Sequence, residues 1–244
     1  MRLTVSMIKK TLILVIFASL SFSLSAQNKF HKKKVNQPNF EKHTFHFGFS
    51  LGTNKSSFRT KYDLTAIDSL TSIQVAKQTG FNIGFVGSMR FNNFFTLRFL
   101  PTLAFAQRDV DFIFKNTDRN ITNSRIIEST YVMFPLLIKY RSLRYNNFAA
   151  YVVAGGNYAH DLSSKIDVDN NLVIDAQVLK VKKDNFFAEI GFGTDFFLEY
   201  FKFGIEFKYS HGLNNILYKD DSFWAKPIQE IKPGMFTISL LFEG

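Results

Sequence analysis

The sequence contains no cysteine, and no long apolar run occurs after residue 26. The missing cysteines exclude disulfide bonds and cysteine-based zinc or redox chemistry. A membrane-spanning helix needs about 20 apolar residues. The longest apolar stretch after residue 26 lies near 131–138 and contains Pro135. We therefore do not expect the mature chain to be a helical membrane protein.

Phenylalanine is abundant instead. The chain has 244 residues, of which 30 are Phe, and aromatic residues make up 16%. Mean hydropathy is nevertheless close to zero, at −0.03, and 20% of the residues are charged. So many Phe residues at neutral hydropathy mean that apolar and polar residues are finely mixed, as in strands with one apolar face.

The first 26 residues have the pattern of a secretory signal peptide. Arg2, Lys9 and Lys10 form a basic start, and an apolar stretch follows at 11–24. Ser25 and Ala26 then supply small residues for cleavage. We predict a signal peptide at 1–26 and an exported mature chain.

Basic residues are concentrated just after the predicted signal peptide. The formal net charge is +10, and the sequence HKKK occupies 31–34. Such tracts occur in nucleic-acid-binding proteins and in segments that lie near anionic lipid headgroups. Export favours the second interpretation, so no nucleic-acid partner is predicted. We expect 27–42 to form an extended basic arm in the periplasm, followed by one domain at 43–244.

Residues 43–244 alternate between apolar and polar positions. In the stretch FHFGFSLG, Phe45, Phe47 and Phe49 share one face, while Gly48 and Ser50 lie on the other. Strict alternation at this length predicts strands. The eight predicted strands span 45–53, 80–90, 94–107, 129–141, 147–160, 184–198, 201–211 and 234–242.

The predicted connections alternate between short and long. Short turns are expected near 91–93, 142–146 and 199–200, and long loops at 54–79, 108–128, 161–183 and 212–233. Short periplasmic turns and long outer loops are typical of outer-membrane barrels. The predicted fold class is all-β: an eight-stranded antiparallel up-and-down transmembrane β-barrel. It would contact the lipid of a Gram-negative outer membrane and have both termini in the periplasm.

A soluble β-sandwich or a lipocalin-like barrel would also alternate, but its apolar face would point inward. Here small polar residues and glycines dominate the second face, and they suit the crowded interior of a narrow barrel. Bulky Phe residues suit lipid, and aromatics cluster near strand ends as in a membrane girdle. Phe242, third from the end, also resembles the C-terminal signal read by barrel-assembly machinery. The membrane barrel is therefore favoured.

Charged residues of both signs are predicted on the inward face. An eight-stranded barrel is only just wide enough for its own side chains, and unpaired charges there would be costly. We therefore predict an ion-pair cluster across the lumen. Its members are Arg90, Arg98, Lys139, Glu189, Asp195 and Glu206. The cluster would be a plug that fixes the shape of the barrel or, alternatively, a path for protons or ions.

Two prolines and the only tryptophan are further candidate sites. Pro101 and Pro135 lie symmetrically about residue 118 and are predicted to face each other on neighbouring strands. Proline cannot donate a sheet hydrogen bond, so this rung is either a seam where a partner docks or a bulge without a binding role. Trp224, in the sequence DSFWAKP, is either a loop anchor for a partner or an interface residue.

Rim histidines are the candidates for enzymatic chemistry. His160-Asp161 and His211 are predicted at the outer ends of strands. Acyl transfer needs a nucleophile, a base and an oxyanion site in register, and we find no such spacing. A metal-ligand cluster and a phosphate-binding loop are also missing from the sequence. We predict no enzyme activity, cofactor, metal or small-molecule substrate.

Three stretches carry a resemblance to a known family. They are FLPTLAFAQRDVDF, MFPLLIKYRSLRYNNFAAYVVAGGNY and EIGFGTDFFLEYFKFGIEFKYSHGLNNIL. Together they resemble the PorT family of Bacteroidetes outer-membrane barrels, called SprT in Flavobacteria, over about 40–244. The second stretch is the most specific.

The resemblance implies an accessory role in type IX protein secretion, and in gliding motility where that occurs, with other secretion proteins as partners. No catalytic or binding residues can be transferred from the family. The alternative is a general small outer-membrane barrel that binds surface ligands through its outer loops.

Overall fold

The computed structural model describes residues 35–67, 69–115, 120–166, 177–220 and 222–244. The predicted signal peptide and residues 27–34 of the predicted arm lie outside the described residues. Within the described part of the chain, no helix is both long and apolar enough to span a lipid bilayer.

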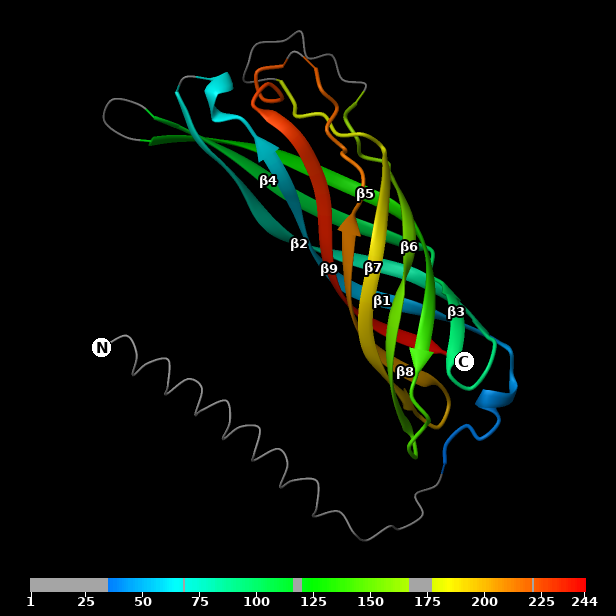
Figure 1. The fold of residues 1–244 in the computed structure, drawn as a ribbon. Coiled ribbons are helices and arrows are strands. Elements are labelled where there is room, and N and C mark those ends of the chain that lie inside the picture. Colours follow the sequence, from blue (N-terminus) through cyan, green and yellow to red (C-terminus); the bar gives the residue numbers. More distant parts are fainter. Residues whose placement is uncertain (1–34, 68, 116–119, 167–176, 221) are drawn as a thin grey trace, which may run out of the picture. The chain divides into compact units, whose positions relative to one another are not determined.

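The described residues form one antiparallel sheet that closes on itself (Figure 1). Its strands are β1 (Phe45–Tyr62), β2 (Leu70–Arg90), β3 (Phe95–Phe99), β4 (Thr102–Lys115), β5 (Asn120–Arg141), β6 (Phe148–Asp161), β7 (Asp184–Phe197), β8 (Lys202–Gly212) and β9 (Ile228–Glu243). Two short 3-10 helices are η2 (Phe40–Lys42) and η3 (Leu64–Ala66). Pairing of β1 with β9 completes the ring. The predicted all-β antiparallel barrel is confirmed.

The predicted third strand, 94–107, is split into β3 and β4 at Leu100 and Pro101. Both pieces pair with β2 on one side and β5 on the other, so they occupy a single place in the ring. The split follows from proline chemistry, because Pro101 has no N–H to donate. Its carbonyl still accepts from the Phe85 N–H at 2.9 Å, and the Leu100 N–H donates to the Pro135 carbonyl at 3.1 Å.

Two predicted long loops are wrong, because most of 54–79 and 108–128 continues as strand. The β1–β2 and β4–β5 pairs therefore extend well beyond the predicted strand ends. In these extensions the apolar residues change sides: Phe58, Val110 and Phe112 point inward and are buried. The sequence prediction followed outward-facing Phe residues, so it ended each strand where that pattern stopped.

We call this end of the barrel, with the extended hairpins and the segments 162–166, 177–183 and 213–227, the loop end. A hydrophobic core fills it, formed by residues from strands and loops together. Its buried members include Phe58, Ile73, Val110, Phe112, Ile216, Trp224, Ile228 and Ile231. The opposite end, with the short turns 91–94, 142–147 and 198–201 and the C-terminus, is the turn end (Figure 1).

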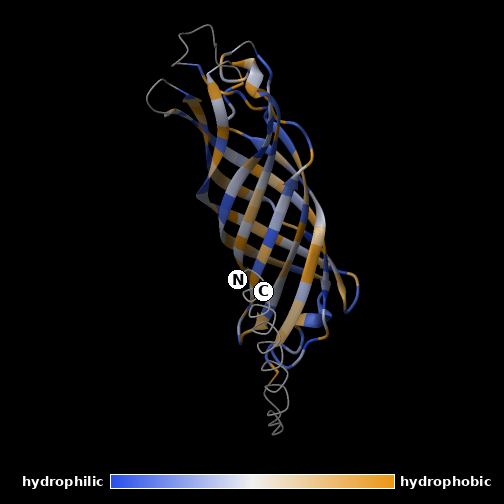
Figure 2. Cartoon of the chain, turned by 60° about the vertical axis from the view of Figure 1, so that its left-hand side comes forward, coloured by the Kyte–Doolittle hydropathy of each residue, from blue (hydrophilic) through white to orange (hydrophobic). Residues whose placement is uncertain are grey.

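Along the middle of the barrel, the large apolar side chains point outward. Phe47 is 70% exposed and Phe85 is 72% exposed, whereas Ser50 and Asn82 on the inner face are buried. Figure 2 shows hydrophobic and hydrophilic residues alternating along these strands. A soluble barrel would have the opposite polarity, so this outer face is suited to lipid.

The closing seam between β1 and β9 leaves no room for a side chain at Gly48. A Cβ atom there would lie 1.9 Å from the Phe242 carbonyl oxygen and 2.9 Å from the Glu243 Cα. We predict that Gly48→Ala lowers the free energy of unfolding by about 1–3 kcal/mol. Urea unfolding of the purified protein measures this change, and heat-dependent gel migration reports the folded fraction at each urea concentration.

Gly87→Ala is the matched control, because a Cβ atom there would meet nothing closer than the Phe99 carbonyl oxygen at 3.7 Å. Equal stability of the two variants would contradict a tight β1–β9 seam.

Candidate functional site

Charged side chains from facing walls meet in the lumen. Arg98 of β3 is fully buried. Its Nη1 lies 2.7 Å from Glu206 Oε2 of β8, and its Nη2 lies 3.2 Å from Glu243 Oε1 of β9. One guanidinium therefore bridges two carboxylates on the opposite side of the barrel, a geometry to which its planar fork is suited.

Three buried lysines complete the network. Lys139 Nζ of β5 lies 2.7 Å from Asp195 Oδ2 of β7. Lys202 Nζ lies 3.0 Å from Glu243 Oε2. The remaining pair joins Lys208 Nζ to Glu189 Oε2 at 2.8 Å. We call these four cations and four carboxylates the lumen network. Its formal charge is zero.

Neutral side chains connect the pairs to one another. The Tyr151 hydroxyl donates to Glu206 Oε2 at 3.0 Å, and its ring centroid lies 3.6 Å from Lys139 Nζ. Asn157 Nδ2 and Ser210 Oγ donate to Glu189 Oε1 at 2.8 and 2.7 Å. These additional hydrogen bonds offset part of the cost of burying the charges.

The sequence identified five members of the lumen network: Arg98, Lys139, Glu189, Asp195 and Glu206. Arg90, the sixth candidate, is not part of it. Arg90 lies at the turn end, where it donates to the Glu41 carbonyl at 3.0 Å and to Asn93 Oδ1 at 3.1 Å. The pairing of the other five is a geometric finding, and their role remains a proposal.

Sequence reasoning missed three charged members and Tyr151. Lys202 and Lys208 share the inward face of Glu206 by simple alternation, so the signal was present. Glu243 lies one residue beyond the predicted end of the last strand. Extending the last predicted strand by one residue and including it among the strands with inward charges would have identified Glu243.

The lumen network leaves little free space. Two cavities bordered by its members have volumes of about 20 Å³ each. A volume of this size holds about one water molecule. The described side chains therefore fill most of the lumen around the network.

Residues 36–42 close the turn end. The Phe40 ring stacks on the His46 ring at a centroid distance of 3.9 Å and meets the Phe197 ring edge-on at 5.6 Å. Glu41 Oε1 pairs with Arg141 Nη2 at 2.6 Å. The predicted extended arm is therefore wrong for this part, because an aromatic ring and a carboxylate hold it against the barrel.

Asn36 and Arg144 fix the beginning of this closing segment. Asn36 N and Nδ2 donate to Asn147 Oδ1 and the Phe197 carbonyl at 2.9 and 3.0 Å. Arg144 Nη2 donates to the Asn36 carbonyl, and its guanidinium carbon lies 3.8 Å from the Phe197 ring centroid.

Trp224 is buried inside the loop end instead of standing on an exposed loop. It is 1% exposed. Its ring centroid lies 4.9 Å from that of Phe112, and the Arg125 guanidinium carbon lies 4.1 Å from its ring. The side chain is not accessible to anchor a partner, because the surrounding core already covers it.

Pro101 and Pro135 do not share a rung. The register pairs Phe99 with Leu136 and Thr102 with Met133, which places Pro135 opposite Leu100. The prediction was off by one residue, because Lys115 pairs with Asn120 at the tip of the hairpin. Its centre is therefore (115 + 120)/2 = 117.5 instead of 118. A partner seam at these residues remains untested.

The rim histidines have polar partners. His160 Nδ1 lies 2.8 Å from Asp184 Oδ1. His211 Nε2 lies 3.0 Å from Arg59 Nη1. Asp161 instead accepts from the Thr130 and Ser163 N–H groups. Among the described residues, no group of three or more His, Asp or Glu side chains is placed to hold a metal ion.

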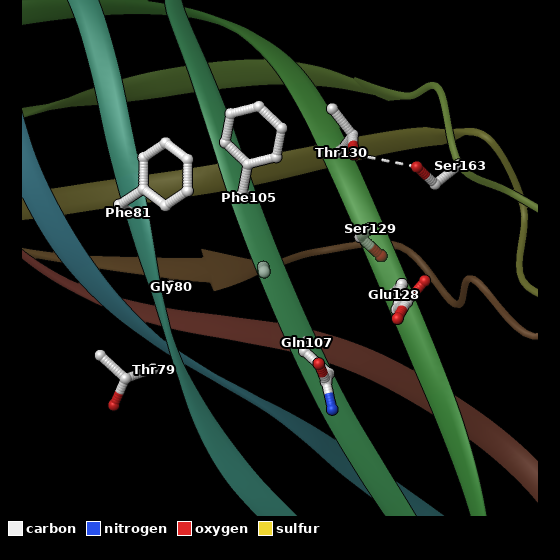
Figure 3. Close-up of a pocket in the computed structure, with 10 residues that line it drawn as sticks. Thr79, Gly80, Phe81, Phe105, Gln107, Glu128, Ser129, Thr130 and Ser163 are labelled. Atoms are coloured by element: carbon white, nitrogen blue, oxygen red, sulfur yellow. Dashed lines mark hydrogen bonds between the residues drawn. The ribbon is translucent and has the colours of Figure 1, made fainter.

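Two larger hollows lie near the loop end. The first, of about 290 Å³, is bordered by Phe81, Phe105, Glu128 and Thr130 (Figure 3). It lies beside the register shift between Lys77 and Phe81, where β2 and β4 lose their pairing. The second, of about 300 Å³, lies between β1, β2, β8 and β9.

Residues 25–218 match the model of a family described as "Outer membrane protein beta-barrel domain". No curated protein matches the chain significantly.

Among solved structures, the outer membrane protein OprG of Pseudomonas aeruginosa is similar, with a TM-score of 0.52 and 16% identity. The match covers 82% of this chain and 95% of that one. Ail of Yersinia pestis has a TM-score of 0.37 and 13% identity, and the match covers 83% of this chain and 100% of that one. At this identity, the likeness to OprG concerns the fold alone.

The lumen network makes a sharp prediction about stability. Lys139→Met leaves the buried Asp195 carboxylate without its partner and should lower the free energy of unfolding by about 3–5 kcal/mol. Adding Asp195→Leu removes the uncompensated charge and should restore most of the loss. Urea titration of the refolded barrel in detergent measures both.

Lys61→Met is the control, because Lys61 pairs with Glu230 at the exposed surface. Its effect should stay below about 1 kcal/mol. If Lys139→Met costs no more than this control, the buried pair does not stabilise the barrel.

Proposed function

The chain belongs to the outer-membrane protein β-barrel domain family. We propose that it is a non-enzymatic accessory component of the type IX secretion system. It acts by docking on larger translocon parts, and it serves gliding motility in bacteria that glide. The barrel lies in the outer membrane of a Bacteroidetes-like bacterium, with both termini in the periplasm.

The observation that carries this proposal is the filled lumen. The eight charges of the lumen network are paired and buried, and residues 36–42 cover the turn end. A function that requires solutes to pass through the barrel does not fit such an interior. A scaffold that presents its outer surfaces to partner proteins does suit it, and the family resemblance over 40–244 names the partner system.

The turn end supplies a surface for such docking. Large apolar side chains stand exposed on the short turns instead of on the lipid-facing strands. They are Phe91, Leu143, Tyr145 and Tyr200, and Tyr200 is 86% exposed. Exposed aromatic residues are enriched where proteins bind one another. In the proposed orientation, these turns face the periplasm.

Deletion in the native host tests the proposal directly. We expect large cargo proteins with type IX C-terminal signals to leave the culture medium and accumulate in the periplasm. Mass spectrometry of both fractions measures the shift, and the wild-type chain supplied in trans should reverse it. An unchanged secretome would overturn the secretion role and favour a barrel that binds surface ligands through its loops.

A Tyr145→Ser/Tyr200→Ser variant tests the docking surface. It should insert normally but restore secretion poorly in the deletion strain. The matched control is Leu162→Ser/Leu213→Ser, which removes two exposed apolar side chains at the loop end. Equal rescue by both variants would rule out docking through the turns.

The orientation has its own test, because the chain has no cysteine. Lys226→Cys at the loop end should react with a membrane-impermeant maleimide on intact cells. Lys42→Cys at the turn end should react only after the outer membrane is opened. The reverse labelling pattern would contradict periplasmic termini.

A further inference from the structure

The second hollow has a basic lining. Lys55 and Arg59 border it from β1, Lys77 from β2, Tyr209 from β8 and Phe236 from β9. We call these five residues and the space between them the basic hollow. Its volume of about 300 Å³ is at the lower end of the range for ligand clefts, roughly 300–1,000 Å³.

The basic hollow exists because β1 and β2 separate. Their pairing ends at Ser56 opposite Gln78. Beyond that point, β1 continues against β9 alone, and β2 continues against β4. Figure 1 shows β2 diverging from β1 toward the loop end. The fork leaves a concave space on the outer wall.

The basic hollow lies at the edge of the lipid-facing belt. Outward residues of β1 change from Phe49 and Leu51 to Lys55 and Arg59 within ten positions of the strand. On β9, Phe236, Ile238 and Leu240 are exposed on the same side. Tyr209 stands at the boundary, the level that aromatic residues prefer in membrane proteins. The cations therefore lie where lipid headgroups begin.

The positive charge of the basic hollow is not neutralised by the described residues. Lys55 and Lys77 are exposed and form no ion pair there. Arg59 Nη1 contacts His211, and its Nη2 donates to the Gly212 carbonyl at 3.0 Å. These contacts fix the position of the guanidinium without supplying a carboxylate.

Nearby carboxylates are engaged elsewhere. Glu230 accepts from Lys232 at 2.7 Å and from Lys61 at 3.0 Å. These hydrogen bonds lower the pKa of Glu230 below its usual value, and the one from Lys232 contributes more than the one from Lys61. Asp109 on β4 accepts from Gln78 at 2.8 Å and from Gln107 at 3.2 Å. Among the described residues, no carboxylate forms an ion pair with Lys55, Arg59 or Lys77.

We propose that the basic hollow binds the phosphate group of a glycolipid in the outer leaflet. Arg and Lys side chains are the usual partners of phosphate oxygens, and basic pockets at headgroup level recognise anionic lipids. The acyl chains would lie along the apolar faces of β1 and β9, beside Leu51 and Ile238. The inference rests on the orientation in the proposed function, which places the loop end outside.

Native mass spectrometry of the purified full chain in detergent tests this assignment. The probes are lipid A carrying its phosphates, the same lipid A after dephosphorylation, and inorganic phosphate as a competitor. We expect the wild-type chain to retain phosphorylated lipid A. The Lys55→Gln/Arg59→Gln/Lys77→Gln variant should lose at least about tenfold in affinity, because each cation near an anionic lipid adds to binding.

The matched control is Lys115→Gln/Lys165→Gln/Lys226→Gln. It removes the same charge from other exposed positions at the loop end and should keep the lipid. A Lys55→Arg/Lys77→Arg variant preserves the charge of the hollow and should also keep it. Heat-dependent gel migration verifies that every variant is folded.

Three results would overturn the proposal. They are equal retention by the wild-type chain and the Gln variant of the hollow, equal binding of dephosphorylated lipid A, and full displacement of the lipid by millimolar inorganic phosphate, which would identify soluble phosphate as the ligand. The assay is independent of secretion, so an unchanged secretome leaves it intact. Cysteine labelling separates a wrong orientation from a failure to bind lipid.

Discussion

The barrel depends on ion pairs that are buried inside a narrow lumen. Four cations and four carboxylates are buried there, and removing any one would leave a charge that cannot reach water. Because Arg98 bridges β3 to β8 and β9, the network fixes the cross-section of the barrel as well as its charge. A rigid, filled interior leaves function to the outer wall and the two ends.

The environment of the outward side chains changes along each long strand. In its middle part, Phe side chains face outward and small polar groups face the lumen. Toward the loop end the polarity changes sides, and Phe58 and Phe112 join a buried core around Trp224. The change of side marks the membrane boundary on these strands. It also explains why the basic hollow lies where it does, since Lys55 is among the first outward charges beyond the belt.

The two ends of the barrel are therefore unlike. At the turn end, Phe40 and Glu41 cover the mouth, and exposed aromatic side chains remain on the turns. At the loop end, charged groups surround a hydrophobic core like that of a soluble protein. The proposed partner protein would bind the exposed aromatic side chains of the turn end, whereas the proposed lipid would bind the cations of the basic hollow. Each can therefore be tested without disturbing the other.

Alternation determined which residues share a face, because side-chain direction repeats every two residues in any strand. The short and long connections and the small residues of the second face then indicated an antiparallel barrel with Phe facing outward. Alternation also placed Arg98, Lys139 and Glu206 on the inner face. Register and pairing partners depend on contacts between distant strands. Only the tertiary structure could therefore offset Pro101 from Pro135, bring Glu243 to Arg98, bury Trp224 and dock residues 36–42. The basic hollow could not be predicted from the sequence either, because the fork between β1 and β2 exists only once β9 has paired with β1 and β4 with β2.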